Sequence, residues 1–176
     1  MPNKLTAIAL GAAMSLAGCA ATGRPPIPTV RQVDLARYMG AWYVIASIPT
    51  YLEKGIFNAV ETYSLNPDGT VAVDFTYHKG SFDAPATTLR PRGFIAASSN
   101  AVWGVRVIWP LKSEYLIAYL NDAYTEVIVA RSARDHVWIM ARTPEISARE
   151  YQNLVALVAG MGYDTAKLEK VPQRWP

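Results

Sequence analysis

The sequence predicts an all-β protein, an eight-stranded antiparallel up-and-down barrel with one C-terminal α-helix packed on its outside. Apolar runs of alternating character recur at spacings of about ten to fifteen residues and are separated by turn residues, which is the pattern of a sandwich or barrel. Every connection after the second run is short, so no segment provides the long crossover of a Greek key. Closure into a barrel would also leave no open sheet edge.

Composition limits the protein to one folded domain. The 176 residues are 51% hydrophobic and 18% charged, and no block of Lys or Arg concentrates the net charge of +3. This balance excludes a disordered chain and a nucleic-acid-binding arm. The ten Tyr, five Trp and four Phe residues provide apolar area for a core or for an apolar ligand.

Residues 1–18 have the features of an export signal. One basic residue precedes an apolar run of about thirteen residues, which is too short to span a bilayer. The run ends in Leu-Ala-Gly-Cys at residues 16–19, which resembles the lipobox of bacterial lipoproteins, and Cys19 is the only cysteine. We therefore expect cleavage before Cys19 and a firm lipid anchor on it. By the lipoprotein sorting rule, Ala20 after the cysteine implies the outer membrane, with the leaflet left open.

Residues 19–32 are predicted to form a lipidated N-terminus and flexible tether. The stretch contains three prolines and has little apolar surface to bury, a composition typical of an extended linker. The alternative is that its last few residues pack on the domain. The folded domain is then expected over residues 33–176.

Eight strands are predicted, near residues 40–48, 57–66, 70–79, 86–96, 101–109, 114–121, 124–131 and 136–142. The second and third strands are joined by Asn66-Pro67-Asp68-Gly69, in which Pro and Asp set a turn and Gly supplies positive φ. Consecutive strands are therefore expected to run antiparallel.

The single predicted helix begins after Ser147, which forms a capping box with Glu150. Its apolar residues repeat at helical spacing, at Tyr151, Leu154, Val155 and Val158. A helix with one apolar stripe must pack on another element. The strand before it offers an apolar outer face of Val137, Ile139 and Ala141.

Period-two alternation predicts an aromatic inner wall. In the fifth strand, for example, Trp103 faces one side and Arg106 the other. The same rule gives the predicted ligand-binding residues Tyr63, Val73, Phe75, Tyr77, Trp103, Val105, Val107, Trp109, Tyr115, Ile117, Tyr119, His136, Trp138 and Met140. The loop 49–57 is predicted to gate the open mouth with Tyr51, Leu52 and Ile56. Such a barrel is either filled by its own side chains or holds one small ligand, and alternation alone does not choose between these.

The sequence lacks motifs for catalysis or metal binding. No Gly-x-Ser-x-Gly elbow occurs, and lipidation would consume the sole cysteine. The two histidines, His78 and His136, have no Cys or paired carboxylate at ligand spacing. We therefore predict no catalytic residue, no metal and no cofactor. An inward Glu61 would carry a proton, bind a cation or meet Arg142, whereas an outward Glu61 would need none of these.

The motif Gly-Ala-Trp-Tyr at residues 40–43 resembles the Gly-x-Trp-Tyr signature that opens the lipocalin barrel after a short helical turn. The similarity continues, in the order the family requires, through residues 53–55, 63–69 and 138–144. It covers about residues 33–170. Together with the lipoprotein signal, it points to the bacterial outer-membrane lipocalins.

The resemblance implies structural roles for Gly40, Trp42 and Arg142, in which Trp42 closes the barrel floor and Arg142 lies across its ring. The family usually has Asp where this chain has Asn121, although Asn also supplies the side-chain acceptor that the turn needs. The implied function is that of a lipid-anchored lipocalin that binds a fatty acid or lysophospholipid and stores or transports it at the outer membrane.

Two alternatives stay open at this point: an envelope enzyme that acts on a lipid in the same cavity, and a structural lipoprotein with a filled barrel. A transmembrane barrel is disfavoured, because Asp74 and Arg106 would face lipid. The sequence determines neither the ligand nor the oligomeric state, and it is compatible with a homodimer.

Overall fold

The computed structural model describes residues 24–106, 110 and 112–175. The helical segments of this part are α1 (Leu35–Tyr38), α2 (Ala148–Gly160) and the 3-10 turn η1 (Thr165–Lys167). The strands are β1 (Gly40–Ile48), β2 (Ile56–Leu65), β3 (Val71–Lys79), β4 (Ala86–Leu89), β5 (Arg92–Ala96), β6 (Ser99–Arg106), β7 (Ser113–Leu120), β8 (Glu126–Ala130), β9 (Val137–Ala141) and β10 (Glu169–Lys170). The expected signal peptide, Cys19, Val107 and Trp109 lie outside the described residues.

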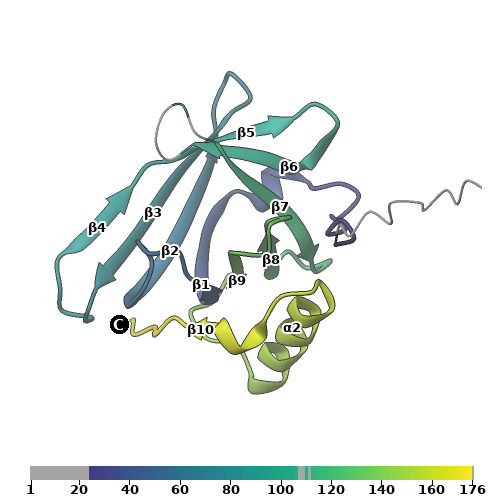
Figure 1. Ribbon diagram of the computed structural model, residues 1–176. Coiled ribbons are helices and arrows are strands. Elements are labelled where there is room, and N and C mark those ends of the chain that lie inside the picture. The colour runs from purple at the N-terminus through teal and green to yellow at the C-terminus, as the bar shows by residue number, and fades with distance from the viewer. Residues whose placement is uncertain (1–23, 107–109, 111, 176) are drawn as a thin grey trace, which may run out of the picture.

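The strands form one closed antiparallel barrel (Figure 1). Pairing follows chain order from β1 through β3, β5 and β6 to β9, and β9 returns to pair with β1 between Tyr43 and Ile48. β4 extends the sheet beside β3. With β4 and β5 counted as one interrupted strand, and with the two-residue β10 counted as an addition beside β1, the predicted eight-stranded barrel is confirmed.

Most strand bounds lie one or two residues from the predicted ranges, and two of the differences have a clear local cause. The expected strand 86–96 is divided into β4 and β5 around Pro91, which has no N–H to donate to a ladder. The expected strand 124–131 begins only at Glu126, because Tyr124 has a φ of +59° and belongs to the preceding turn. Asn121 Oδ1 accepts a hydrogen bond from Thr125 N in that turn at 2.8 Å, so Asn supplies the acceptor there.

The prediction that Tyr119 faces inward is wrong. The register between β7 and β8 shifts between Ile117 and Tyr119, which marks a β-bulge. Ile117 belongs to the hydrophobic core inside the barrel, whereas Tyr119 packs against the core outside it. Because a bulge inserts one extra residue, the alternation that holds as far as Ile117 is inverted at Tyr119.

The barrel has two ends, which we call the mouth and the floor. The mouth carries the loop 49–55 and the connections β3–β4 and β8–β9, and the floor carries the turns 66–70 and 121–125 together with α1. The floor turn after β2 forms as predicted, because Gly69 N donates to Asn66 O at 3.0 Å and Gly69 takes a φ of +78°.

The helix α2 packs on the outer wall, as predicted. The Ser147 hydroxyl accepts from Glu150 N and the Glu150 carboxylate accepts from Ser147 N, so both halves of the capping box are present. Leu154 and Val158 are buried in an outer core that also contains Ile139 and other outward residues of β8 and β9. This packing leaves the inner faces of the strands to the second, internal core.

The C-terminal residues complete the sheet beside β1. β1 pairs with β2 from Gly40 to Tyr43, and nearer the mouth β10 takes the place of β2. Asn58, at a bulge in β2 with a φ of +48°, donates its backbone N–H to Pro172 O at 2.9 Å. Gln173 Nε2 then bonds to Val44 O at 2.8 Å, so the chain end fills the gap between the two strands.

The described part of the expected tether lies against the barrel, as the alternative prediction supposed. Ile27 is buried in the outer core, and Val30 N donates to Ile117 O at 3.0 Å. Pro25 O accepts a hydrogen bond from Arg134 Nη2 at 2.5 Å. In residues 24–106, 110 and 112–175, no helix is long and apolar enough to cross a membrane.

Candidate ligand-binding site

The floor of the barrel is closed by Trp42 and Arg142. The Arg142 Cζ atom lies 3.8 Å from the centroid of the Trp42 ring, and Trp42 is fully buried. The Arg142 guanidinium also donates to the carbonyl oxygens of Ala41, Arg37, Tyr38 and Met39, at 2.7 to 3.0 Å. Gly40 has a φ of +92°, and a Cβ there would lie 3.5 Å from Arg142 Nη1. Arg142 therefore holds α1 across the floor.

A buried carboxyl group lies above the floor, within a cluster of tyrosines. Glu61 is 3% exposed and accepts a hydrogen bond from the Tyr63 hydroxyl. The Tyr115 hydroxyl bonds to those of Tyr63, at 2.8 Å, and Tyr38, at 2.7 Å. Burial raises the pKa of Glu61 to about 7. Glu61 thus faces inward, and its hydrogen-bonding partner is a tyrosine rather than Arg142.

Aromatic rings fill the floor half of the barrel. Trp103 and Tyr115 stack with ring centroids 4.9 Å apart, and Tyr38 meets Trp103 edge to face at 5.5 Å. Tyr63 lies 5.9 Å from Trp103. All four rings are almost fully buried, and the three predicted wall residues among them, Trp103, Tyr115 and Tyr63, pack against one another. Tyr38, which alternation along strands did not reach, comes from α1.

An open hollow lies at the mouth, against the inner face of β3 and β4. It has a volume of about 420 Å³ and is lined by Tyr51, Leu52, Lys54, Tyr77, Lys79 and Thr87. This volume falls in the range of about 300–1,000 Å³ that is typical of small-molecule sites. Phe75 packs on Tyr77 at 5.0 Å and faces Trp138 at 6.4 Å, so aromatic rings continue below the hollow.

Lys79 fixes the loop 49–55 over this hollow. Its Nζ atom donates to Leu52 O at 3.0 Å and to Lys54 O. Gly80 N donates to Gly55 O at 2.8 Å, which joins the end of the loop to the end of β3. Sequence reasoning missed Lys54, Lys79 and Thr87 as lining residues. Lys79 follows Tyr77 at period two, and that signal could have found it.

Trp138, on the inner face of β9, and His136, which directly precedes β9, form a polar pair. Their rings meet edge to face at 4.4 Å, and His136 is 6% exposed. His136 Nδ1 lies 2.6 Å from Ile48 O and 3.5 Å from Glu53 Oε2, so Nδ1 carries the proton. Burial lowers the pKa of His136, which favours the neutral ring. Among the described residues, neither His136 Nε2 nor Trp138 Nε1 has a hydrogen-bonding partner.

The remaining predicted wall residues lie along the inner core. Val73, Ile117 and Met140 are buried within it, and Val105 packs against it while half-buried. Within the described ranges, no group of three or more His, Cys, Asp or Glu side chains is arranged to hold a metal ion.

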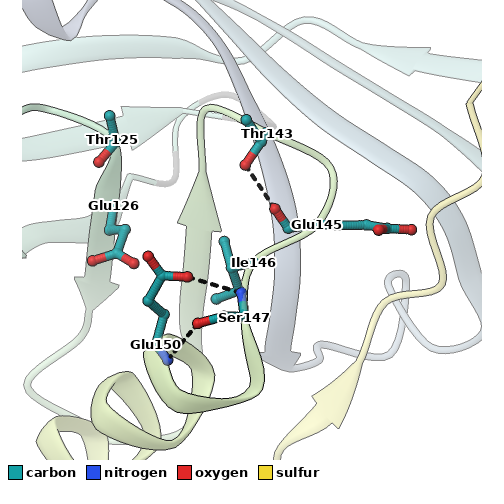
Figure 2. A pocket seen from close by; sticks show the side chains of 7 residues that line it. All are labelled: Thr125, Glu126, Thr143, Glu145, Ile146, Ser147 and Glu150. Carbon is teal, nitrogen blue, oxygen red and sulfur yellow. Dashed lines mark hydrogen bonds between the residues drawn. The ribbon is translucent and has the colours of Figure 1, made fainter.

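A second hollow lies outside the barrel, beside the start of α2 (Figure 2). Its volume is about 390 Å³, and Glu126, Glu145 and Glu150 line it with Thr125, Thr143, Ile146 and Ser147. Burial, and the neighbouring Glu150, raise the pKa of Glu126. This acidic surface does not suit an apolar ligand, and it places negative charge near the floor.

These features define a class of protein: a closed up-and-down barrel with a blocked floor, an open mouth and an external helix. A family model for the lipocalin-like domain matches residues 33–173. The chain therefore belongs to the lipocalin family.

Curated relatives match over most of the chain. The chain is 30% identical to outer membrane lipoprotein Blc of Escherichia coli K12, over 96% of this chain and 97% of the relative. It is 31% identical to temperature-induced lipocalin-1 of Arabidopsis thaliana, over 86% of each chain.

Solved structures share the fold at lower identity. Lobster apocrustacyanin A1 matches with a TM-score of 0.65 and 12% identity, over 85% of this chain and 92% of the other. Insecticyanin of the tobacco hornworm Manduca sexta matches with a TM-score of 0.61 and 17% identity, over 85% and 86%. These likenesses concern the fold alone.

Proposed function

We propose that this protein is a lipid-anchored lipocalin that binds a fatty acid or lysophospholipid and stores or transports it at the outer membrane. The observation that carries the proposal is the hollow at the mouth, where apolar rings meet two lysines. The acyl chain would lie against Tyr77 and Phe75, where burial of its methylene groups supplies most of the affinity. The relatives named outer membrane lipoproteins support the location.

The rim suits an anionic headgroup. Lys54 and Lys79 line the hollow, and the ion pairs formed among the described residues involve neither of them. A carboxylate or phosphate is attracted to such a pair of ammonium groups, and the attraction weakens with added salt.

His136 and Trp138 supply a second, uncharged contact. With its proton on Nδ1, His136 presents Nε2 as an acceptor, and Trp138 Nε1 is a donor. A protonated carboxyl group offers a hydroxyl and a carbonyl, and so does the glycerol ester of a lysophospholipid. A lysophospholipid therefore meets this pair with its glycerol ester while its phosphate meets the lysines. The single carboxyl group of a fatty acid meets either the lysines as a carboxylate or this pair as the neutral acid, and a buried polar atom without a partner is costly.

The anchor completes the proposal. Cys19, with lipid attached, would hold the domain to the membrane from which the ligand comes. A catalytic role is not proposed, because the groups gathered at the mouth are those of a binding site: aromatic rings, two lysines and one donor–acceptor pair. The rings of the floor half pack against one another, and the proposed ligand would lie in the hollow at the mouth.

The test is mass spectrometry of lipids extracted from the protein after purification without detergent. The protein used for this test is the chain from residue 20 onward, because it contains every described residue. We expect one monoacyl lipid in a molar ratio near unity. Titration of lipid-free protein with palmitic acid and with a lysophospholipid should then quench tryptophan fluorescence saturably. Absence of both extracted lipid and quenching would overturn the proposal.

A further inference from the structure

The N-terminal segment joins the barrel at its mouth. Arg134 lies in the β8–β9 connection and donates from Nη2 to Pro25 O at 2.5 Å and from Nε to Met161 O at 2.7 Å. This connection belongs to the mouth, because Val137 at the start of β9 pairs with Ile48, the last residue before the mouth loop. From Pro25 the chain therefore runs from the mouth toward the floor.

The contacts that follow confirm this direction. Val30 lies beside the middle of β7. Val33 N donates to Asn100 Oδ1 at 2.9 Å, and Asn100 Nδ2 donates to Val33 O at 2.6 Å, where β6 begins at the floor. Asp34 N then bonds to the Tyr124 hydroxyl in the floor turn, at 2.8 Å. The side of the barrel nearest to the residues before Pro25 is thus the mouth.

Chain length limits how far an anchor can lie from the mouth. Cys19 precedes Pro25 by six residues, and an extended chain spans at most about 3.6 Å per residue, or roughly 20 Å in all. A lipid on Cys19, which is part of the proposed function and on which this inference rests, would therefore keep the mouth close to the bilayer. The floor would face away from the membrane.

The mouth also carries the most exposed large apolar side chains of the described residues. Tyr51 is 87% exposed and Leu52 is 57% exposed, and they are adjacent at the tip of the mouth loop. Tyrosine and leucine both partition favourably into the interfacial region of a bilayer, and lysines beside them are attracted to anionic headgroups. Lys54 and Lys79 occupy that position.

The mouth and the floor differ in charge: two acidic residues at the mouth are paired with arginines, whereas acidic residues gather on one surface near the floor. At the mouth, Asp83 is paired with Arg174 at 2.8 Å and Asp135 with Arg131 at 3.3 Å. Near the floor, the hollow of Figure 2 gathers three glutamates on one surface. An anionic membrane surface would therefore attract the mouth and repel the floor.

We propose that the mouth docks on the anionic surface of the membrane that holds the anchor, with Tyr51 and Leu52 in the interfacial region and Lys54 and Lys79 against the headgroups. A ligand then passes between the bilayer and the hollow without crossing water. The partner is thus a lipid surface rather than a second protein.

Flotation with vesicles tests the docking apart from the anchor. The chain from residue 20 onward is mixed with vesicles of phosphatidylcholine alone or with about one third phosphatidylglycerol. We expect binding to the anionic vesicles and about tenfold weaker binding after the double change Tyr51→Ser and Leu52→Ser. Leu65→Ser is the matched control, because Leu65 is an exposed apolar residue at the floor turn. Equal losses in both variants, or no binding by the unchanged chain, would overturn the docking.

A depth measurement on the acylated protein gives the second readout. With the Cys19 thiol occupied by lipid, a single environment-sensitive label is attached after Leu52→Cys or Leu65→Cys. The label at 52 should report the bilayer interface and the label at 65 should report water. The reverse order would overturn the orientation, whereas an unmodified Cys19 in the mass of the mature protein would overturn the anchor and leave the flotation result standing.

Discussion

The floor and the mouth of the barrel are built from the same residue types, but they differ in whether the polar atoms of those side chains have hydrogen-bonding partners within the protein. At the floor, Arg142 and the hydroxyls of Tyr63 and Tyr115 have protein partners, and the rings touch each other. At the mouth, Trp138 Nε1 and His136 Nε2 have none among the described residues, and a hollow adjoins Tyr77. The contrast teaches that aromatic content alone does not mark a ligand site: at the floor the rings pack against one another, whereas at the mouth Tyr77 lines a hollow.

The largest expected effect of a substitution is at the floor. Arg142→Met removes the stacking on Trp42 and leaves several carbonyl oxygens without their donor, so we expect the free energy of unfolding to fall by about 4 kcal/mol. Arg142→Lys keeps the charge but not the fork of donors and should lose about half as much. Urea denaturation measures both changes.

Arg90→Ala is the control for this prediction. Arg90 pairs with Asp74 at 3.1 Å on the surface, and a surface pair of this kind contributes about 0–1 kcal/mol. A loss in Arg142→Met no larger than that in Arg90→Ala would show that Arg142 does not fasten the floor.

A second expected effect concerns the pH dependence of stability. The folded-state pKa of Glu61 is about 7, raised from 4.5 by burial, so the folded state binds its proton more tightly than the unfolded state does. The resulting stabilisation is complete below about pH 4.5 and is lost as the pH rises through 7. From the lower pH limit to the upper one, this contribution to the free energy of unfolding falls by on the order of 3 kcal/mol.

Glu61→Gln isolates this contribution, because glutamine keeps an acceptor for the Tyr63 hydroxyl and does not titrate. The free energy of unfolding, measured by urea denaturation from pH 4 to pH 9, should fall less with pH in the variant than in the unchanged chain. His136 has a lowered pKa and acts in the opposite sense in both proteins, so it cancels in the difference. Parallel curves would contradict the assigned burial of a titrating Glu61.

The smallest expected effect separates two tryptophans. Trp138→Phe removes an indole N–H without a protein partner, so we expect lysophospholipid affinity to fall about fivefold with little change in stability. Trp103→Phe removes an N–H that bonds to Asn100 O at 2.8 Å within the packed floor, so stability should fall by about 1–2 kcal/mol with affinity unchanged. Calorimetric titration and urea denaturation measure the two quantities. The opposite assignment of effects would refute the distinction between floor and mouth.

The fold follows from local patterns that the sequence displays directly. Alternation placed Trp103, Phe75 and Trp138 on one side, and Ser147 with Glu150 marked the start of α2. The errors have local causes that alternation does not encode. Neither the bulge that turns Tyr119 outward nor the break at Pro91 changes the apolar pattern on each side of it.

The candidate site was less predictable, because several of its polar contacts come from segments without a repeating pattern. Glu53 reaches His136 from the mouth loop, and Tyr38 reaches Tyr115 from α1. Such contacts depend on how loops fold over the barrel, which strand periodicity does not describe. His136, Trp138 and Lys79 are the exceptions: alternation along the last strand gave the first two, and Lys79 continues the inward series of β3 beyond Tyr77.

The seam of the barrel has a consequence for how the molecule is made. β1 pairs with β9 and β10, so these pairings form only after residues near the opposite end of the chain have been synthesised. The hydrogen bond from Asn58 to Pro172 likewise needs the C-terminal residues. A growing polypeptide cannot complete this ring until synthesis is almost finished, and pairings so distant along the chain form slowly. Until then β1 keeps an unpaired flank, so a chaperone that covers extended segments would find its natural target there.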